Sequence, residues 1–134
     1  MSVILKVDDS FDETFIISNE VHNGFIQLFK DKNPLHTDEA FAVSKGFQQR
    51  VMHGNILNGF ISYFVGECLP GKNVIIHSQE IQFVSAVYMN EQLQLRAVVT
   101  GTYQAGKTVE FKFTFKNGSL KTVAKGKIQI GILQ

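Results

Sequence analysis

Residues 108–118 read TVEFKFTFKNG, and this stretch decides the fold. Its apolar residues alternate with polar ones: Val109, Phe111, Phe113 and Phe115. A two-residue period is typical of a β-strand that buries one face, so we predict a strand over residues 108–116. The Asn-Gly pair that follows predicts a two-residue type I′ hairpin, which would place Phe115 opposite Leu120 on the next strand.

Three further strands are predicted, over residues 73–84, 92–103 and 119–132. The turn before the phenylalanine strand contains Ala105 and Gly106, and its length sets the register. A three-residue loop places Tyr103 opposite Val109 and keeps apolar residues beside the phenylalanine row. A two-residue loop would set that row against a largely polar face. We therefore predict the three-residue loop and an antiparallel sheet with one apolar face.

Residues 54–69, GNILNGFISYFVGECL, carry apolar side chains all round a helical wheel. Such a helix is expected to be buried on every side, and Pro70 with Gly71 would end it. It is the only fully apolar element available to cover the phenylalanine face. We therefore predict an α+β hot-dog fold, in which an antiparallel sheet wraps around a buried central helix, although periodicity alone also allows other α+β packings.

The first half of the chain carries helix and loop signals. After a short strand over residues 11–17, Ser18 is a suitable N-cap for a helix that should end near Lys30. Pro34 is expected to forbid helix around itself. Thr37 is expected to cap a second short helix that follows.

The 134 residues suit one domain, 1–134, of ordinary globular composition, with 44% apolar and 19% charged residues. The formal net charge is +1 and the basic residues are scattered, which argues against a nucleic-acid partner. The longest weakly charged stretch is too short to cross a membrane, and the apolar N-terminal stretch is too short for a signal peptide. The predicted location is therefore the cytoplasm.

The sequence holds one cysteine, Cys68, which excludes an internal disulfide and predicts only a small buried side chain. No two of the four histidines have the spacing of a zinc-binding helix, so no metal site is predicted. These histidines are His22, His36, His53 and His77. Dinucleotide-binding, phosphate-binding and serine-hydrolase motifs are also absent.

Residues 31–38 read DKNPLHTD and hold the strongest candidates for chemistry. Pro34 rules out one continuous helix, so Asp31 and His36 are predicted on a loop between two helices, where both side chains can turn toward one point. A carboxylate and an imidazole form a natural acid–base pair. The alternative is that Asp31 merely ends one helix and His36 merely precedes the next.

His53 and Gly54 open the predicted central helix. The free N–H groups and positive dipole of a helix start, with a glycine that allows close approach, could form an oxyanion hole. Alternatively, Gly54 only relieves crowding and His53 is a hydrogen-bonded structural histidine. Gly54, Asn58 and Ser62 lie near one helix face at four-residue steps, where their polar groups need partners in the protein or in a wet site.

The segment 31–38 resembles the D-x-N-P-[IL]-H-x-D signature of MaoC-like hydratases, and residues 51–54 resemble its V-x-H-G continuation. The resemblance extends from about residue 11 to residue 103. It implies that Asp31 and His36 form the catalytic dyad and that the Gly54 N–H binds the thioester oxygen. It also implies that three more residues bind the substrate: Asn33, His53 and Ser62.

The chain departs from the family pattern at a few positions. The family often has glycine where this chain has Lys30. Its F-x-x-P-V-x-x-G-D stretch corresponds to residues 83–91, with Ala86 for proline, Asn90 for glycine and Glu91 for aspartate. Asparagine tolerates the positive φ that a glycine position often requires. These changes leave the dyad intact and bear on the substrate range.

The resemblance implies (R)-specific hydration of trans-2-enoyl thioesters to (3R)-hydroxyacyl thioesters. It implies no cofactor, with coenzyme A or an acyl carrier protein carrying the acyl group, and a homodimer whose sheets join edge to edge. Two alternatives stay open. One is a non-catalytic acyl-binding protein, and the other is a hot-dog thioesterase, which commonly has a carboxylate on the central helix, where this chain has only Glu67.

Overall fold

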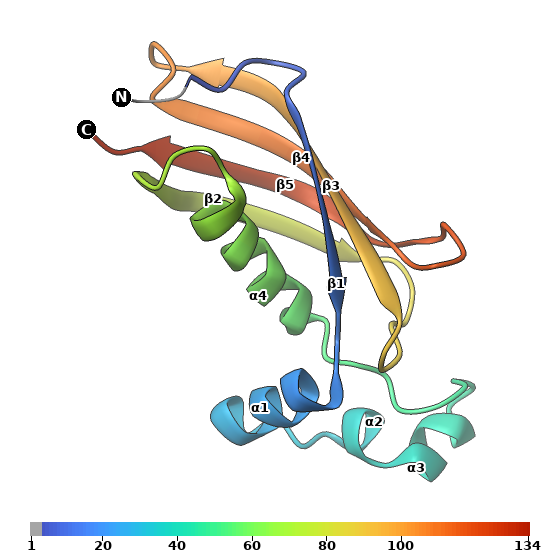
Figure 1. The fold of residues 1–134 in the computed structure, drawn as a ribbon. Helices are drawn as coiled ribbons and strands as arrows, with labels where there is room; N and C mark the ends of the chain where they lie inside the picture. The colour runs from blue at the N-terminus through green and yellow to red at the C-terminus, as the bar shows by residue number, and fades with distance from the viewer. Residues whose placement is uncertain (1–3) are drawn as a thin grey trace.

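The computed structural model describes residues 4–134. Five strands form one antiparallel sheet in the order β1-β3-β4-β5-β2. The strands are β1 Ser10–Ile16, β2 Val74–Phe83, β3 Gln92–Tyr103, β4 Thr108–Lys116 and β5 Thr122–Ile132. The helices are α1 Asn19–Phe29, α2 Pro34–Thr37, α3 Glu39–Ser44 and α4 Asn55–Tyr63, which continues as the π-helical segment η1 Phe64–Cys68. The sheet curls around α4, while α1, α2 and α3 gather at one end of the molecule (Figure 1). This is the predicted α+β hot-dog fold.

The phenylalanine face of β4 forms the core, as predicted. Its four apolar side chains are at most 2% exposed: Val109, Phe111, Phe113 and Phe115. They pack in one cluster with the inner face of α4, including Ile56, Leu57 and Ile61. The predicted bounds of β3 and β4 agree with the structure, because apolar and polar residues that alternate over nine or more positions fit only a strand with one buried face.

The predicted register of the β4–β5 hairpin is wrong by four residues. Phe115 pairs with Ala124 instead of Leu120. The side-chain oxygen of Asn117 accepts hydrogen bonds from the N–H groups of Ser119 and Lys121, and Leu120 takes the left-handed backbone with a φ of 61°. The loop is therefore longer than a two-residue type I′ turn. Since the shift is an even number, the same face stays buried.

The predicted β3–β4 register is also wrong, by one residue near the turn and by two residues farther along the strands. Tyr103 pairs with Thr108, the pairing of the shorter loop, and a bulge between Val99 and Gly101 then places Phe111 opposite Val99. The bulge inserts one residue and returns the apolar residues of β3 to the core face. The burial pattern therefore selected the correct face, while the bulge set a register that alternation could not reveal.

The central helix is buried on one side only, which corrects the prediction of burial all round. Its inner residues Ile56, Leu57 and Ile61 are at most 4% exposed, whereas Ser62 and Tyr63 are exposed on the outer side. On the outer side Tyr63 is 54% exposed, while Phe60 is partly covered by stacking on Phe15 of β1. A helix that is apolar all round can thus be half-exposed in one copy of the chain.

Helix α1 begins and ends as predicted. The Ser18 side chain accepts a hydrogen bond from the Val21 N–H, and Lys30 ends the helix in the left-handed conformation with a φ of 66°. That backbone explains why glycine suits the position before Asp31, since glycine adopts positive φ without a steric penalty.

The predictions for Pro34 and Thr37 are wrong. Pro34 is the first residue of α2, where proline is favoured because its missing N–H would have no helical partner, and Asn33 caps that turn. Asp38 caps α3 by accepting from the Phe41 N–H, while Thr37 ends α2. His36 consequently lies on a helical turn and not on a loop.

Among residues 4–134 no helix is long and apolar enough to span a membrane. The predicted domain, 1–134, includes residues 1–3, which lie outside the described residues, and the prediction of a single domain stays a prediction.

Candidate active site

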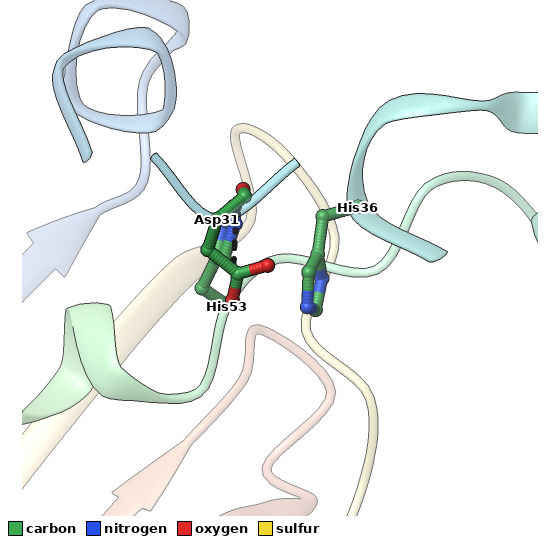
Figure 2. Close-up of side chains that lie close together, drawn as sticks. All are labelled: Asp31, His36 and His53. Carbon is green, nitrogen blue, oxygen red and sulfur yellow. Dashed lines mark hydrogen bonds and ion pairs between the residues drawn. The ribbon is translucent and has the colours of Figure 1, made fainter. Parts of the chain in front are cut away.

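The fold brings Asp31 and His36, which are five residues apart in the sequence, together with the more distant His53 (Figure 2). Asp31 follows α1, His36 lies on α2, and His53 precedes α4. One side-chain N or O atom from each lies within 4.8 Å of the others. The pair predicted from residues 31–38 is therefore assembled at one place, and His53 joins it.

Asp31 is held by its main chain and leaves its carboxylate accessible. Its carbonyl oxygen accepts a hydrogen bond from His53 Nε2 at 3.0 Å. One carboxylate oxygen accepts from the Asn33 N–H at 3.2 Å, and the side chain is 49% exposed. The carboxylate can therefore meet a ligand without losing its anchor.

His36 presents one free ring nitrogen. Its Nδ1 lies 2.7 Å from the carbonyl oxygen of Val51. A carbonyl only accepts, so Nδ1 carries the hydrogen and donates it, which leaves the lone pair of a neutral ring on Nε2. The ring stacks on His53 with centroids 3.9 Å apart and planes 28° apart. His36 can thus accept or return a proton at Nε2.

His53 is a buried support for the pair. It is 3% exposed, packs against Phe25 with ring centroids 4.6 Å apart, and its Nε2 lies 4.0 Å from an Asp31 carboxylate oxygen. Burial lowers the pKa of His53 and outweighs the Asp31 carbonyl and carboxylate, which favour the protonated ring. His53 is therefore neutral at pH 7 and donates its Nε2 hydrogen to Asp31, which fits the structural alternative for this histidine.

Gly54 fits both roles proposed for it from the sequence, relief of crowding and part of an oxyanion hole. A Cβ at this position would lie 2.7 Å from Phe83 Cε1, so the glycine relieves crowding. Within residues 4–134 no backbone carbonyl accepts its N–H, which precedes the first turn of α4. A free N–H beside a glycine Cα is also what an oxyanion hole requires.

A pocket of about 430 Å³ joins these groups. Asp31, His36, His53 and Gly54 line it, with residues 83–87 opposite. A wider apolar groove of about 880 Å³ runs between α1 and α4 and also borders Asp31. The carboxylate therefore stands where a polar pocket meets an apolar groove.

Two of the predicted substrate-binding residues lie elsewhere. Asn33 uses its side-chain oxygen to cap α2, accepting from the Leu35 N–H at 2.9 Å, and it does not line the pocket. Ser62 is exposed on the outer side of α4 and borders neither the pocket nor the groove. Asn58, on the same predicted face, accepts a hydrogen bond from Gln79. The binding roles implied for Asn33 and Ser62 stay predictions.

The donor set of the cluster suits proton transfer better than a metal ion. His53 has committed its Nε2 hydrogen to Asp31, and its remaining lone pair, on Nδ1, is buried. Only the Asp31 carboxylate and His36 Nε2 then offer free lone pairs to the pocket, short of the three or four protein ligands usual for zinc. Cys68 is remote from this cluster in sequence and half-buried, and burial raises the pKa of its thiol to about 11.

Sequence reasoning missed His22 and Phe83. His22 is fully buried and its ring centroid lies 5.4 Å from that of His53. Its position three residues before Phe25 on α1 is a signal that could have placed it on the inner side of that helix. Phe83 ends β2, and no local pattern indicates that its ring would lie over Gly54.

Comparisons with known proteins identify the family of the chain. The family described as MaoC like domain matches residues 9–119. The chain belongs to the MaoC-like family. This confirms the resemblance drawn from residues 31–38 and 51–54.

Curated relatives of this MaoC-like chain include two (R)-specific enoyl-CoA hydratases. The one from Rhodospirillum rubrum is 34% identical over 90 residues, which cover 67% of this chain and 62% of that protein. The one from Aeromonas caviae is 36% identical over 76 residues, which cover 57% of each. The chain thus spans about three-fifths of the length of these relatives.

Solved structures show the same fold over nearly the whole chain. The (R)-hydratase from A. caviae, involved in PHA biosynthesis, has a TM-score of 0.88 at 23% identity, covering 96% of this chain and 97% of that one. An R-hydratase from Pseudomonas aeruginosa has a TM-score of 0.87 at 25% identity, covering 97% and 83%. The hot-dog fold of the MaoC-like chain therefore rests on both its own topology and these structures.

Proposed function

We propose that this protein catalyses the reversible, (R)-specific hydration of trans-2-enoyl thioesters to (3R)-hydroxyacyl thioesters. The observation that carries the proposal is the meeting of the Asp31 carboxylate and His36 Nε2 in a pocket that also holds the Gly54 N–H. The names of the relatives, (R)-specific enoyl-CoA hydratases, support the same reaction.

The chemistry requires a base, an acid and a site for negative charge. Hydration adds OH to Cβ and H to Cα, and the thioester oxygen gains negative charge as water attacks. One water held between Asp31 and His36 would lose a proton to the pair while its oxygen bonds to Cβ. The pair would then return that proton to Cα on the same side, and the Gly54 N–H would stabilise the enolate-like oxygen.

We assign the roles of base and acid to Asp31 and His36 as a pair. Asp31 and His36 share one proton across the reaction. His53 would take no proton in this scheme, because its Nε2 hydrogen holds the Asp31 carbonyl. The apolar groove between α1 and α4 would accommodate the acyl chain.

No cofactor is required by this scheme, and the acyl carrier would be coenzyme A or an acyl carrier protein. The decisive experiment is a hydration assay with a series of trans-2-enoyl-CoA lengths beside the matching carrier-protein thioesters. We expect (3R)-hydroxyacyl product from at least one series, and the preferred series identifies the carrier. Absence of hydration with every thioester would contradict the proposal, as would a (3S) product.

We propose a homodimer as the working form. The outer edges of β1 and β2 have no neighbouring strand within the described chain, and free edges need cover. Apolar side chains of α1 at the groove beside α4 are also exposed, with Leu28 at 75% and Phe29 at 69%. Sedimentation at micromolar concentration should show a dimer, and a stable monomer would contradict this. We also expect the enzyme to act in the cytoplasm.

The two alternative functions receive no support from a specific contact. A thioesterase carboxylate would be expected on the central helix, but Glu67 lies in η1, is 61% exposed, and forms an ion pair of 2.7 Å with Lys72. A non-catalytic acyl-binding protein would have no need for a free imidazole nitrogen beside a free carboxylate. Hydration is therefore the function that the site supports best.

A further inference from the structure

Helix α1 buries a histidine on its inner side. His22 is 0% exposed, whereas the apolar Val21 and Leu28 on the same helix are 36% and 75% exposed. A histidine that is buried where an aliphatic residue would pack costs solvation free energy unless its ring is used. The proposed reaction does not use it.

His22 lies directly behind the candidate site. Its ring packs against His53, and the main chain of His36 is close enough to favour the protonated ring. Neither nitrogen of His22 makes a hydrogen bond of good geometry within residues 4–134, and the same is true of His53 Nδ1. Three unpartnered buried nitrogens thus belong to two rings in contact, next to the residues that hold the dyad.

We propose that His22 is a positioning residue of the active site, which as a neutral ring backs His53 and so maintains the hydrogen bond from His53 Nε2 to the Asp31 carbonyl. The inference rests on the proposed function, because it assigns His22 to the same dyad. It has two parts. The volume of His22 holds His53 in place, and the ability of His22 to gain a proton limits the pH range in which it does so.

The second part follows from the charges that face His22. These are His53 before α4, His36 on α2 and Arg50 in the segment between them, with Asp31 beyond His53. Burial is the largest cause that lowers the pKa of His22, followed by the charges of His53 and Arg50. As the pH falls below the ordinary histidine value of about 6.5, the unfolded chain therefore takes up a proton that the folded site refuses. Stability is lost in that range, and a proton forced onto His22 would place a buried positive charge near Arg50, which repels it.

Two substitutions separate the two parts. His22→Ala removes the volume, and we expect kcat at pH 8 to fall about tenfold with little change in KM, because small displacements of catalytic groups have large effects on turnover. His22→Leu keeps a side chain of similar volume that cannot take up a proton. It should keep kcat at pH 8 within about threefold of wild type and retain more of that activity at pH 5.5 than wild type does.

Stability against pH provides a readout that needs no substrate. Below pH 6.5 the folding equilibrium constant of His22→Leu should fall less steeply than that of wild type, by up to about tenfold per pH unit, which is the effect of one proton. His77→Gln is the matched control, because His77 is an exposed histidine on β2 and its loss should change neither profile.

The outcomes are distinct. Wild-type kcat in His22→Ala, or unchanged activity and stability profiles against pH in His22→Leu, would overturn the proposal for His22. If wild type hydrates no enoyl thioester at all, the proposed function fails, while the stability profile of His22→Leu still shows whether His22 is held neutral in the folded protein.

Discussion

The inner face of the sheet is buried along its length, whereas the segment from α1 to the start of α4 buries only a few side chains, and the two regions differ in the chemistry of what they bury. On the sheet, the side chains of β4 that face α4 are apolar and at most 2% exposed. In the segment, two of the buried side chains are histidines, His22 and His53, stacked behind His36. The sheet therefore supplies stability without titratable groups, while the segment gives up some stability to hold imidazoles in fixed positions.

Removing a member of the dyad should produce the largest effect and should leave the sheet intact. General acid–base groups commonly contribute about 10²–10⁴-fold in rate. Asp31→Asn and His36→Ala should therefore each lower the turnover of a short enoyl thioester by at least about 10²-fold while the unfolding temperature stays close to that of wild type. The double variant should be little slower than either single one, because residues that act as a unit are non-additive.

Asp12→Asn and His77→Gln are the matched controls, one exposed carboxylate and one exposed imidazole outside the site. Asp12 is 67% exposed in an ion pair with Arg96, and such surface pairs contribute little. Both controls should hydrate the substrate as wild type does. Near-normal turnover in either dyad variant would sink the catalytic assignment.

Truncating a core side chain should have the opposite effect from removing a member of the dyad: the loss should fall on stability rather than on the chemistry of the site. Phe113 is 2% exposed and lies between Ala97 and Gly126 on the neighbouring strands. Those small neighbours cannot fill the space of a removed ring, so Phe113→Ala should lower the free energy of unfolding by about 3–5 kcal/mol. Denaturant unfolding measures this, and Leu120→Ala, at 72% exposure in the β4–β5 loop, should have almost no effect. An unchanged unfolding midpoint in Phe113→Ala would show that the face assignment is wrong.

The same contrast explains what the sequence could predict of the fold. Each phenylalanine of β4 indicates the same buried face, so an error in one turn does not change which face is predicted to be buried. The register near each turn depends on one or two residues, and Asn117 satisfied its own neighbours instead of forming the type I′ turn. The short helices depend on single caps as well: Asp38, and not Thr37, caps α3 by accepting from the Phe41 N–H. Competition between local hydrogen-bond partners produces no periodic pattern in the sequence from which it could be predicted.

The site was predictable where its residues are close in sequence. The motif placed Asp31 and His36 together, and the structure agrees, because Asn33 and Pro34 fix the turn between them. The contact of His22 with His53 was not predictable, since it joins segments separated by thirty-one residues and depends on how α1 packs.

Adding a methyl group at the start of α4 should have an intermediate effect that falls on activity more than on stability. The Cβ of Gly54→Ala would lie 2.7 Å from Phe83 Cε1, but that ring is half-exposed and can move aside. We expect a loss of about tenfold in kcat/KM, smaller than the 10²–10³-fold typical when an oxyanion donor is removed, because the N–H remains.

A second variant separates the two roles of this glycine. In Gly54→Ala with Phe83→Ala the crowding is gone, but the new methyl group still blocks the approach of a ligand to the N–H. The double variant should therefore stay slower than Phe83→Ala alone. Equal rates for these two proteins would mean that Gly54 only relieves crowding.

The smallest expected effect concerns the residue that joins α1 to the dyad. Lys30 has a φ of 66°, and a non-glycine residue in that conformation costs roughly 1–2 kcal/mol. Glycine removes the cost but loses about 0.5–1 kcal/mol through the greater freedom of the unfolded chain, so Lys30→Gly should raise the free energy of unfolding by about 0.5–1 kcal/mol. Lys32→Gly is the matched control and should lower it, because Lys32 has no positive φ to relieve. Since Lys30→Gly keeps the same backbone, Asp31 should stay in place and turnover should not change. A loss of stability in Lys30→Gly, measured by denaturant unfolding, would show that the lysine side chain contributes more than its backbone costs.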